Sequence, residues 1–348
     1  SKDPHLFTEV GEDFLEECRK SSDNGTNHKH YFKDHNLTYR NYIEPFFRND
    51  QIEKIDTPRL VQWEKWRDKQ RIKSPDLSHG RLKKEYTTIY QILKRGVELG
   101  YLKQLPVKPQ TLLKMKRRTK KDPERGWFTG KEYKKLLQVS RKRVEESKKK
   151  WLLQKRLKKD KTKKSFGGHW EGIYRDRLYL HYYIILLTST GTRPGELMTV
   201  RHKGVTKVDD DDEYKVHLVL TVEGKTQQTR RVVSRYSGYY GYEGLVENVC
   251  PDHHPNDFLF PTSPRNGFRE LLEESGLRYS SNGDKRDSKS LRHSYLMWGC
   301  LSGESVTFLE KNTGVSPQIM KDHYLRHLST VSKSVREVLI QPSKIRDI

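Results

Sequence analysis

The sequence predicts a mainly α-helical protein with one small antiparallel β-sheet, divided into two domains. Apolar residues recur at helical spacing through the first hundred residues, which favours a helical first domain. Residues 213–224 and 229–236 alternate apolar and polar side chains around a short polar turn, a pattern typical of a β-hairpin. From Ser290 onward the helical pattern returns. The length of 348 residues also favours two domains over one.

Two helices of the first domain are marked by their ends and their spacing. In IDTPRLVQWEKW, either Asp56 or Thr57 occupies the N-cap position and Pro58 lies in the first turn, so a helix begins here. In RLKKEYTTIYQILKRGVELGYL, apolar residues three or four apart form one stripe. The polar side of this helix carries Lys83, Lys84, Lys94 and Arg95. Gly100 and Pro106 end it, and we expect a compact helical domain within residues 1–106.

A linker and a second domain follow. Residues 107–127 are polar, basic and proline-containing without apolar periodicity, and we interpret them as the interdomain linker. The second domain, residues 128–348 with a C-terminal tail, begins with a helix whose capping box pairs Thr129 with Glu132. The near-continuous apolar run at 178–190 predicts a buried helix.

Between Arg141 and Lys164 the chain is extremely basic. A solvated helix face followed by a loop, and direct contact with phosphates, explain this segment equally well. The residues that we single out for phosphate contact are Lys158, Lys159, Lys163 and Lys164.

The charge balance indicates a polyanionic partner, for which nucleic acid is the usual candidate. Lys and Arg number 69 against 46 Asp and Glu, a formal net charge of +23. No apolar run is long enough to span a membrane, and the first residues lack the apolar core of a signal peptide. Three scattered cysteines do not suggest disulfides. We therefore expect a cytoplasmic, nucleoid-associated protein.

Two acidic or histidine-rich segments raise the question of a metal. The aspartates at 209–212 are interpreted as a solvated turn, because consecutive aspartates cannot all face one ion. The segment CPDHHPND contains Cys250, His253 and His254, but no second ligand pair at a recognisable spacing accompanies it. We interpret it as a solvated loop and expect no metal and no cofactor.

The first motif that carries chemistry is TSTGTRPGEL, where a buried helix runs into a turn punctuated by Gly and Pro. The planar fork of Arg193 suits two phosphate oxygens, and Glu196 is spaced to hold that guanidinium in place. An ordinary structural Arg–Glu pair at a helix start is the alternative. A second candidate is Lys225, at the tip of the predicted hairpin, which can donate a proton to a leaving oxygen.

Two further motifs lie near the C-terminus. In KSLRHSYLMWG, Lys289 and Arg292 are three apart at the beginning of a helix, so both can face one side, where the helix N-terminus favours an anion. In NTGVSPQIMKDHYLRH, Ser316 caps and Pro317 opens a short helix that leads to Tyr324.

Together these motifs resemble the catalytic domain of the tyrosine recombinases, the lambda-type phage integrases and their Xer-type relatives. The resemblance covers about residues 125–330, and extends more weakly to the first domain, which is similar to the family's core-binding domain. The matching residues are Gly191, Arg193, Glu196 and Leu197 in the first motif, Lys225, Thr226, Arg231 and Val232 in the hairpin, and Lys289, Arg292 and His293 in the third.

The resemblance implies a clamp on double-stranded DNA and a metal-free phosphotransfer at specific recombination sites. Arg193 and Arg292 hold the scissile phosphate, with Glu196 and His293 in support. Tyr324 attacks the phosphorus to give a 3′-phosphotyrosyl link, Lys225 protonates the leaving 5′ oxygen, and Lys289 assists phosphate binding. Four protomers then exchange strands through a Holliday junction, with accessory DNA-bending proteins as possible partners. A type IB topoisomerase and a non-catalytic DNA-binding relative are the alternatives.

One position departs from the family pattern. The family carries histidine or tryptophan nine residues before the nucleophile, whereas this chain has Val315, which cannot donate a hydrogen bond. Asn312 and His323 are the candidates to replace that donor. The stretch YSGYYGYEG has no counterpart in the family, and we interpret it as loop packing rather than as a base-stacking surface.

Overall fold

The computed structural model describes residues 5–28, 30–70, 79–109, 126–159, 169–210, 215–224 and 228–325. As the sequence predicts, the protein is mainly helical and contains a small antiparallel sheet. The chain divides into two compact units, unit 1 (Ser1–Lys121) and unit 2 (Asp122–Ile348). Among the described residues, no helix has the length and apolar character needed to cross a membrane.

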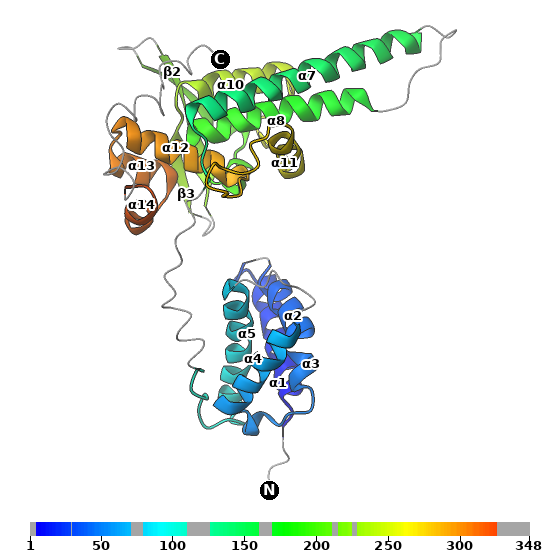
Figure 1. The fold of residues 1–348 in the computed structure, drawn as a ribbon, viewed down its shortest axis with the longest axis vertical. Helices are drawn as coiled ribbons and strands as arrows, with labels where there is room; N and C mark the ends of the chain where they lie inside the picture. Colours follow the sequence, from blue (N-terminus) through cyan, green and yellow to red (C-terminus); the bar gives the residue numbers. More distant parts are fainter. Residues whose placement is uncertain are drawn as a thin grey trace. The chain divides into compact units, whose positions relative to one another are not determined.

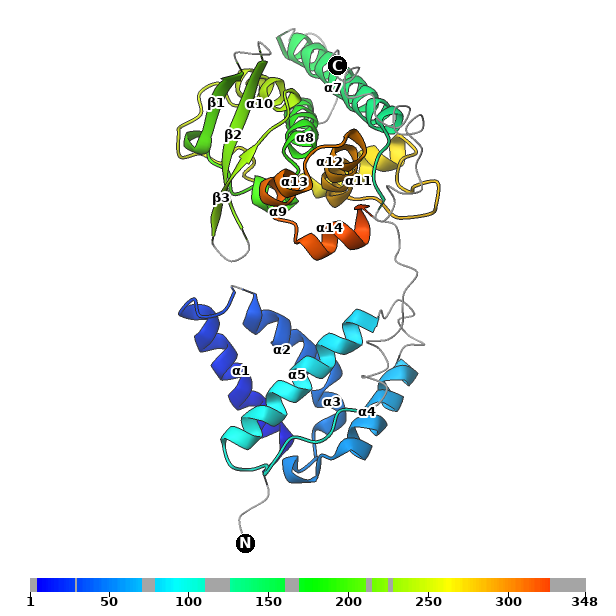
Figure 2. The same cartoon turned by 90° about the vertical axis from the view of Figure 1, so that its left-hand side faces the viewer.

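The described part of unit 1 is built from helices (Figure 2). These helices surround an apolar core of their own. Phe7, Tyr39 and Trp63 are fully buried at its centre, and the indole N–H of Trp63 donates to the carbonyl of Tyr42. The helices of unit 1 are α1 (Phe7–Asp23), α2 (Tyr31–Tyr42), α3 (Glu44–Phe47), the 3₁₀ helix η1 (Ile52–Lys54), α4 (Thr57–Gln70) and α5 (His79–Glu98).

The two helices predicted in this region are present. Helix α4 is capped by Asp56, whose carboxylate accepts the backbone N–H of Arg59 at 2.8 Å. On α5 the predicted stripe faces the core, with Leu82, Tyr86, Ile89 and Leu93 buried. After α5 the chain stays against unit 1 for a few residues, since the Thr57 hydroxyl donates to the carbonyl of Val107.

Unit 2 combines a helical body with the three-stranded sheet. Its helices are α7 (Gly130–Lys159), α8 (Trp170–Thr190), α9 (Pro194–Leu197), the 3₁₀ helix η3 (His202–Gly204), α10 (Ser237–Asn248), α11 (Arg265–Glu274), α12 (Ser288–Ser302), α13 (Val306–Thr313) and α14 (Pro317–His323). Its strands are β1 (Val205–Asp210), β2 (Lys215–Glu223) and β3 (Thr229–Val233).

Helices α7 and α8 lie side by side and extend beyond the rest of unit 2 (Figure 1). The predicted capping box opens α7, because Glu132 accepts the backbone N–H of Thr129 at 2.9 Å and the Thr129 hydroxyl accepts that of Glu132 at 3.3 Å. The C-terminal half of α8 is the buried helix expected at 178–190. Trp127, the last residue of the predicted linker, already packs against the core of unit 2.

The sheet has the order β1–β2–β3, with both pairs antiparallel (Figure 2). Strands β2 and β3 are the predicted hairpin. Strand β1 was not predicted from the sequence, because its segment VTKVDD contains only two apolar residues and includes aspartates that are typical of a turn. Asp209 and Asp210 belong to this strand, while residues 211–214 lie outside the described residues.

The glycine–tyrosine stretch YSGYYGYEG is not a loop, and the sequence-based interpretation was wrong here. It starts helix α10, which packs against α8 and β2. Its glycines permit close approach to α8, since a Cβ on Gly244 would lie 2.4 Å from the ring of Tyr182 and one on Gly241 would lie 2.8 Å from Ile185. Glycine weakens a helix, so close packing is the reason that it is tolerated here.

Candidate active site

The candidate site of unit 2 is organised around the turn between α13 and α14. Gly314 ends α13 with a positive φ of 66°. Two backbone carbonyls of this turn receive guanidinium hydrogen bonds: Arg193 donates to Gly314 at 3.0 Å, and Arg292 and Arg230 donate to Thr313 at 2.8 and 3.0 Å. Three arginines from separate elements therefore converge on two consecutive residues.

Arg193 is positioned by the end of the buried helix α8. Gly191 closes that helix with a φ of 63°, and a Cβ there would lie 2.3 Å from the ring of Tyr295, so glycine is needed for both conformation and space. The chain then turns so that Arg193 precedes α9 and keeps 49% of its side chain exposed. Its guanidinium is thus fixed on one side and open to solvent on the other.

Glu196 holds two of the arginines together. Its buried carboxylate accepts from Arg193 at 2.5 Å and from Arg230 at 2.8 and 3.1 Å. Burial by itself raises the pKa of Glu196, but the hydrogen bonds from Arg230 and Arg193 outweigh burial and lower that pKa to about 2. Arg230 was not predicted from the sequence, since the family pattern aligns with the neighbouring Arg231, which is exposed.

Arg292 lies deeper than Arg193 and is 5% exposed. Its Nη1 donates to the carbonyls of Gly191 and Thr313, at 2.9 and 2.8 Å. Burial, with the charge of Arg193 as a smaller cause, lowers the pKa of Arg292 to about 10, so the side chain stays protonated at neutral pH. Among the described residues, its hydrogen bonds are made through Nη1. The Nε and Nη2 groups can therefore donate to a ligand.

Tyr324 directly follows the short helix α14. Ser316 caps this helix, accepting the backbone N–H of Ile319 at 3.4 Å, and Pro317 opens it, as the sequence indicates. The Tyr324 side chain is buried and its hydroxyl is 2.5 Å from Nδ1 of His293 on α12. Tyr324 is close enough to Arg292 to affect the pKa of that arginine. The structure thus brings together Arg193, Glu196, Arg292, His293 and Tyr324.

Other candidate residues lie elsewhere or outside the described residues. Lys289 is exposed at the start of α12 and, in the part of the chain that the structure describes, contacts neither Arg193 nor Arg292. Arg292, three residues later, is buried, so these two side chains do not share an environment. Lys225 lies outside the described residues.

Asn312 and His323 were the two candidates to supply the hydrogen-bond donor that Val315 lacks, and the structure shows the surroundings of both. Val315 is 9% exposed and belongs to the apolar core. The Asn312 side chain is fully engaged: its Oδ1 accepts from the backbone of Val233, and its Nδ2 donates to the Val233 carbonyl and to the Tyr295 hydroxyl. Asn312 therefore fixes β3 against α12, and the suggestion that it binds phosphate is wrong. His323 is half-buried on α14.

The basic residues proposed to contact DNA differ in how freely they can do so. On α5, Lys83 and Lys84 are exposed, whereas Lys94 pairs with Glu98 at 3.6 Å and Arg95 pairs with Asp13 and Glu98. The side chains of Lys158 and Lys159 in α7, together with Lys163 and Lys164, lie outside what the structure describes.

The same arrangement of helices and sheet is found in solved structures of DNA recombinases. A lambda integrase tetramer bound to a Holliday junction superposes with a TM-score of 0.59 at 14% identity, covering 93% of this chain and 78% of that one. The fold is that of the tyrosine recombinases.

Two further structures support this similarity. The XerH site-specific recombinase bound to a palindromic difH substrate gives a TM-score of 0.55 at 14% identity, covering 91% of this chain and 78% of that chain. The Tn1549 transposon integrase, in complex with circular intermediate DNA, gives 0.54 at 13% identity, covering 94% and 98%. No protein-family profile matches the chain, and no curated protein matches it in sequence.

Proposed function

We propose that this chain is a site-specific DNA recombinase that cleaves and rejoins DNA through a covalent 3′-phosphotyrosyl intermediate. The observation that carries the proposal is the convergence of Arg193 and Arg292 on the Thr313–Gly314 turn, close to Tyr324. A phosphate held by two arginines beside a tyrosine hydroxyl is a site for nucleophilic attack at phosphorus.

The two arginines have complementary parts in this proposal. Arg193, half-exposed, and Arg292, buried with unused N–H groups, both donate to the non-bridging oxygens of the scissile phosphate. Charge builds on those oxygens in the transition state, so fixed donors accelerate the reaction more than they tighten binding. Glu196 keeps Arg193 in place by accepting a hydrogen bond from its guanidinium group. The same carboxylate also accepts from Arg230.

Proton movements at the two bridging oxygens complete the reaction. As the oxygen of Tyr324 bonds to phosphorus, its proton passes to Nδ1 of His293, which is 2.5 Å away. The bond from phosphorus to the 5′ oxygen breaks, and Lys225 gives that oxygen a proton. Lys225 lies outside the described residues, and we assign it this role from the resemblance of its sequence motif to that of the tyrosine recombinases. The 3′-phosphotyrosyl link conserves the bond energy for rejoining.

The assembly that we propose rests on the similarity in fold to a lambda integrase that forms a tetramer on a Holliday junction. Four protomers pair two DNA sites and exchange strands through a Holliday junction, with the helical unit 1 serving as the core-binding domain and the basic segment around the linker following the DNA backbone. Accessory DNA-bending proteins are further candidates as partners, and the protein would act on nucleoid DNA in the cytoplasm.

The experiment that tests this function begins with the unknown target. DNA trapped covalently on the protein in cells is sequenced, and two copies of the recovered site are then offered to the purified protein. Reciprocal strand exchange between the two sites supports the proposal. Relaxation of supercoiled plasmid without exchange would identify a type IB topoisomerase instead, and binding without a covalent product would identify a non-catalytic relative.

A further inference from the structure

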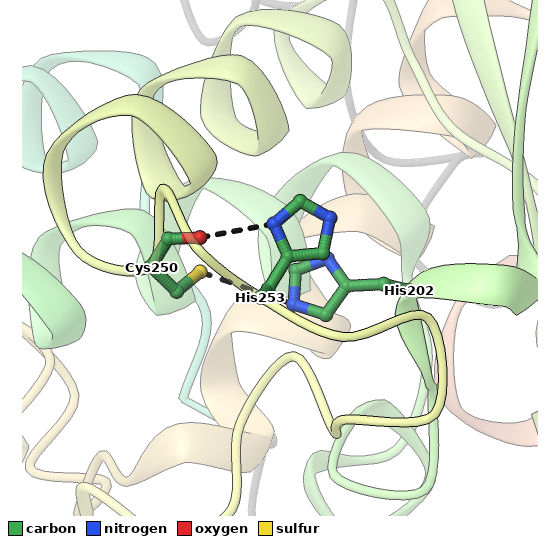
Figure 3. A group of neighbouring side chains, drawn as sticks. All are labelled: His202, Cys250 and His253. Atoms are coloured by element: carbon green, nitrogen blue, oxygen red, sulfur yellow. Dashed lines mark hydrogen bonds between the residues drawn. The ribbon is translucent and has the colours of Figure 1, made fainter.

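A cluster of three side chains lies outside the candidate active site and contains the ligand types that zinc prefers. His202 belongs to η3, and Cys250 and His253 lie in the segment that follows α10. One ligand atom from each residue lies within 4.8 Å of the other two. Figure 3 shows the two imidazole rings stacked, 3.7 Å between centroids, with the sulfur of Cys250 beside them. Most of CPDHHPND is exposed, as expected of a solvated loop, whereas Cys250 and His253 are half-buried beside His202.

Backbone hydrogen bonds help to hold these residues in place. The N–H of His202 donates to the carbonyl of Asp257 at 3.0 Å, and that of Lys203 donates to Pro255 at 2.8 Å. The N–H of Cys250 donates to the carbonyl of Leu245 in the last turn of α10. His202, 48 residues before Cys250, is therefore fixed next to it by the fold. A pre-arranged set of ligands lowers the cost of binding an ion.

The orientation of His202 also suits a ligand. Its Nδ1 is 3.3 Å from the hydroxyl of Tyr242, so its Nε2 faces the sulfur of Cys250 at 3.8 Å. A tetrahedral zinc with Zn–S of about 2.3 Å and Zn–N of about 2.1 Å separates sulfur from nitrogen by about 3.6 Å. A hydrogen bond on the non-ligating nitrogen is the usual way in which proteins orient a metal-binding imidazole.

We propose that His202, Cys250 and His253 form a zinc site, with water in the fourth position, that fastens the 250–257 segment to η3. Binding replaces the thiol proton of Cys250 by the ion, and that proton is released to solvent. His253 turns from its hydrogen bond with the Cys250 carbonyl to reach the ion. Because η3 leads directly into β1, the ion stabilises the edge of the sheet. The site is separate from the phosphate chemistry, since none of its contacts involves Arg193, Arg292 or Tyr324.

The test uses the full chain, reduced and freed of metal, and cobalt(II) as the spectroscopic probe. We expect one cobalt per chain, with the visible bands of a tetrahedral ion and a thiolate-to-cobalt charge-transfer band in the near ultraviolet, all removed by one equivalent of zinc. Cys250→Ser should lose the charge-transfer band, and His202→Ala or His253→Ala should weaken binding by at least about tenfold.

The matched control is His254→Ala, since His254 neighbours His253 but its Nδ1 accepts from the backbone N–H of Asn256. This variant should bind cobalt as the parent does. If a variant does not fold, thiol alkylation of the parent chain gives a second readout: zinc should slow the modification of Cys250. Cobalt bound without a charge-transfer band, or no stoichiometric binding together with unprotected Cys250, would overturn the proposal. Neither readout involves DNA.

Discussion

The two arginines of the candidate site differ in how much of each guanidinium the protein itself engages. Arg193 is tied to Glu196 and to Gly314, whereas Arg292 uses Nη1 for two backbone carbonyls and is buried. Each guanidinium group is therefore held by the protein itself, before any substrate binds. Such pre-orientation costs nothing at the moment of reaction, which is why fixed donors of this kind contribute to rate.

Replacing either arginine should therefore affect the rate of cleavage more than DNA affinity. For Arg193→Ala and Arg292→Ala we expect single-turnover cleavage to fall by about 10²–10³, with binding changed far less. Cleavage and affinity are measured on the same DNA, and a thermal melt of each variant checks folding. A parallel collapse of binding and cleavage in a folded variant would show that the arginine has only a structural role.

Glu196 links the site to acid stability. Its folded-state pKa of about 2 lies below the ordinary 4.5, so the stabilisation that it gives is complete above pH 4.5 and is lost as the pH falls towards 2. A pKa lowered by this much corresponds to a contribution of about 3 kcal/mol to the free energy of unfolding. The Glu196→Gln variant should lack this part of the pH dependence. Denaturant unfolding of both proteins between pH 2 and 6 measures the free energy of unfolding at each pH. If the two plots of this free energy against pH run parallel, Glu196 does not have the lowered pKa.

At the scale of elements, charge alone does not identify a DNA-binding helix. Four basic residues of α5 look equivalent in the sequence, but Arg95 is committed to Asp13 and Glu98, and Lys94 to Glu98. Lys83 and Lys84 are exposed and available to phosphates. Within the described residues, the four basic residues of α5 thus divide into two exposed lysines and two residues with internal partners.

This division makes a prediction about salt dependence. Lys83→Ala with Lys84→Ala should weaken binding to target and random DNA alike, because phosphate contacts carry no sequence information. Each lost contact should flatten the plot of log K against log[salt] by roughly 0.9. Arg95→Ala should mainly lower stability, and Lys54→Ala, an exposed lysine on η1, serves as the control. An unchanged slope in the double variant would remove α5 from the DNA interface.

The elements that the sequence predicted are those with strong local signals. Helices α4, α5 and α7 are predicted by their capping residues and apolar stripes. The β2–β3 hairpin is predicted by the alternation of apolar and polar residues. Strand β1 and helix α10 were missed because tertiary packing, rather than local preference, sets their conformation. Of the candidate site residues, Arg193, Arg292 and Tyr324 were proposed from the sequence motifs.

The other features that were not predicted from the sequence depend on contacts between residues far apart in the chain. Arg230 reaches Glu196 across 34 residues, and His202 reaches Cys250 across 48, so neither pairing leaves a spacing that a single sequence can reveal.

At the scale of the whole molecule, the two units have separate cores, and every residue proposed for chemistry belongs to unit 2. If the proposed function is right, we expect unit 1 to contribute affinity and placement on DNA rather than bond breaking. The fragment 107–348 should consequently still form a covalent adduct, but only at higher DNA concentration and with a shallower salt dependence. Adduct yield against DNA concentration measures this. A folded fragment that never reacts, even at saturation, would show that unit 1 takes part in the chemistry.

In the proposed mechanism Tyr324 is the nucleophile. The variant Tyr324→Phe removes one hydroxyl from a buried ring and should preserve the fold and DNA binding. The measurement is a suicide substrate carrying a nick near the cleavage point, resolved on a denaturing gel beside the parent protein. We predict a covalent protein–DNA adduct for the parent chain and none for Tyr324→Phe, with equal binding by both. An adduct that persists in Tyr324→Phe would contradict the account.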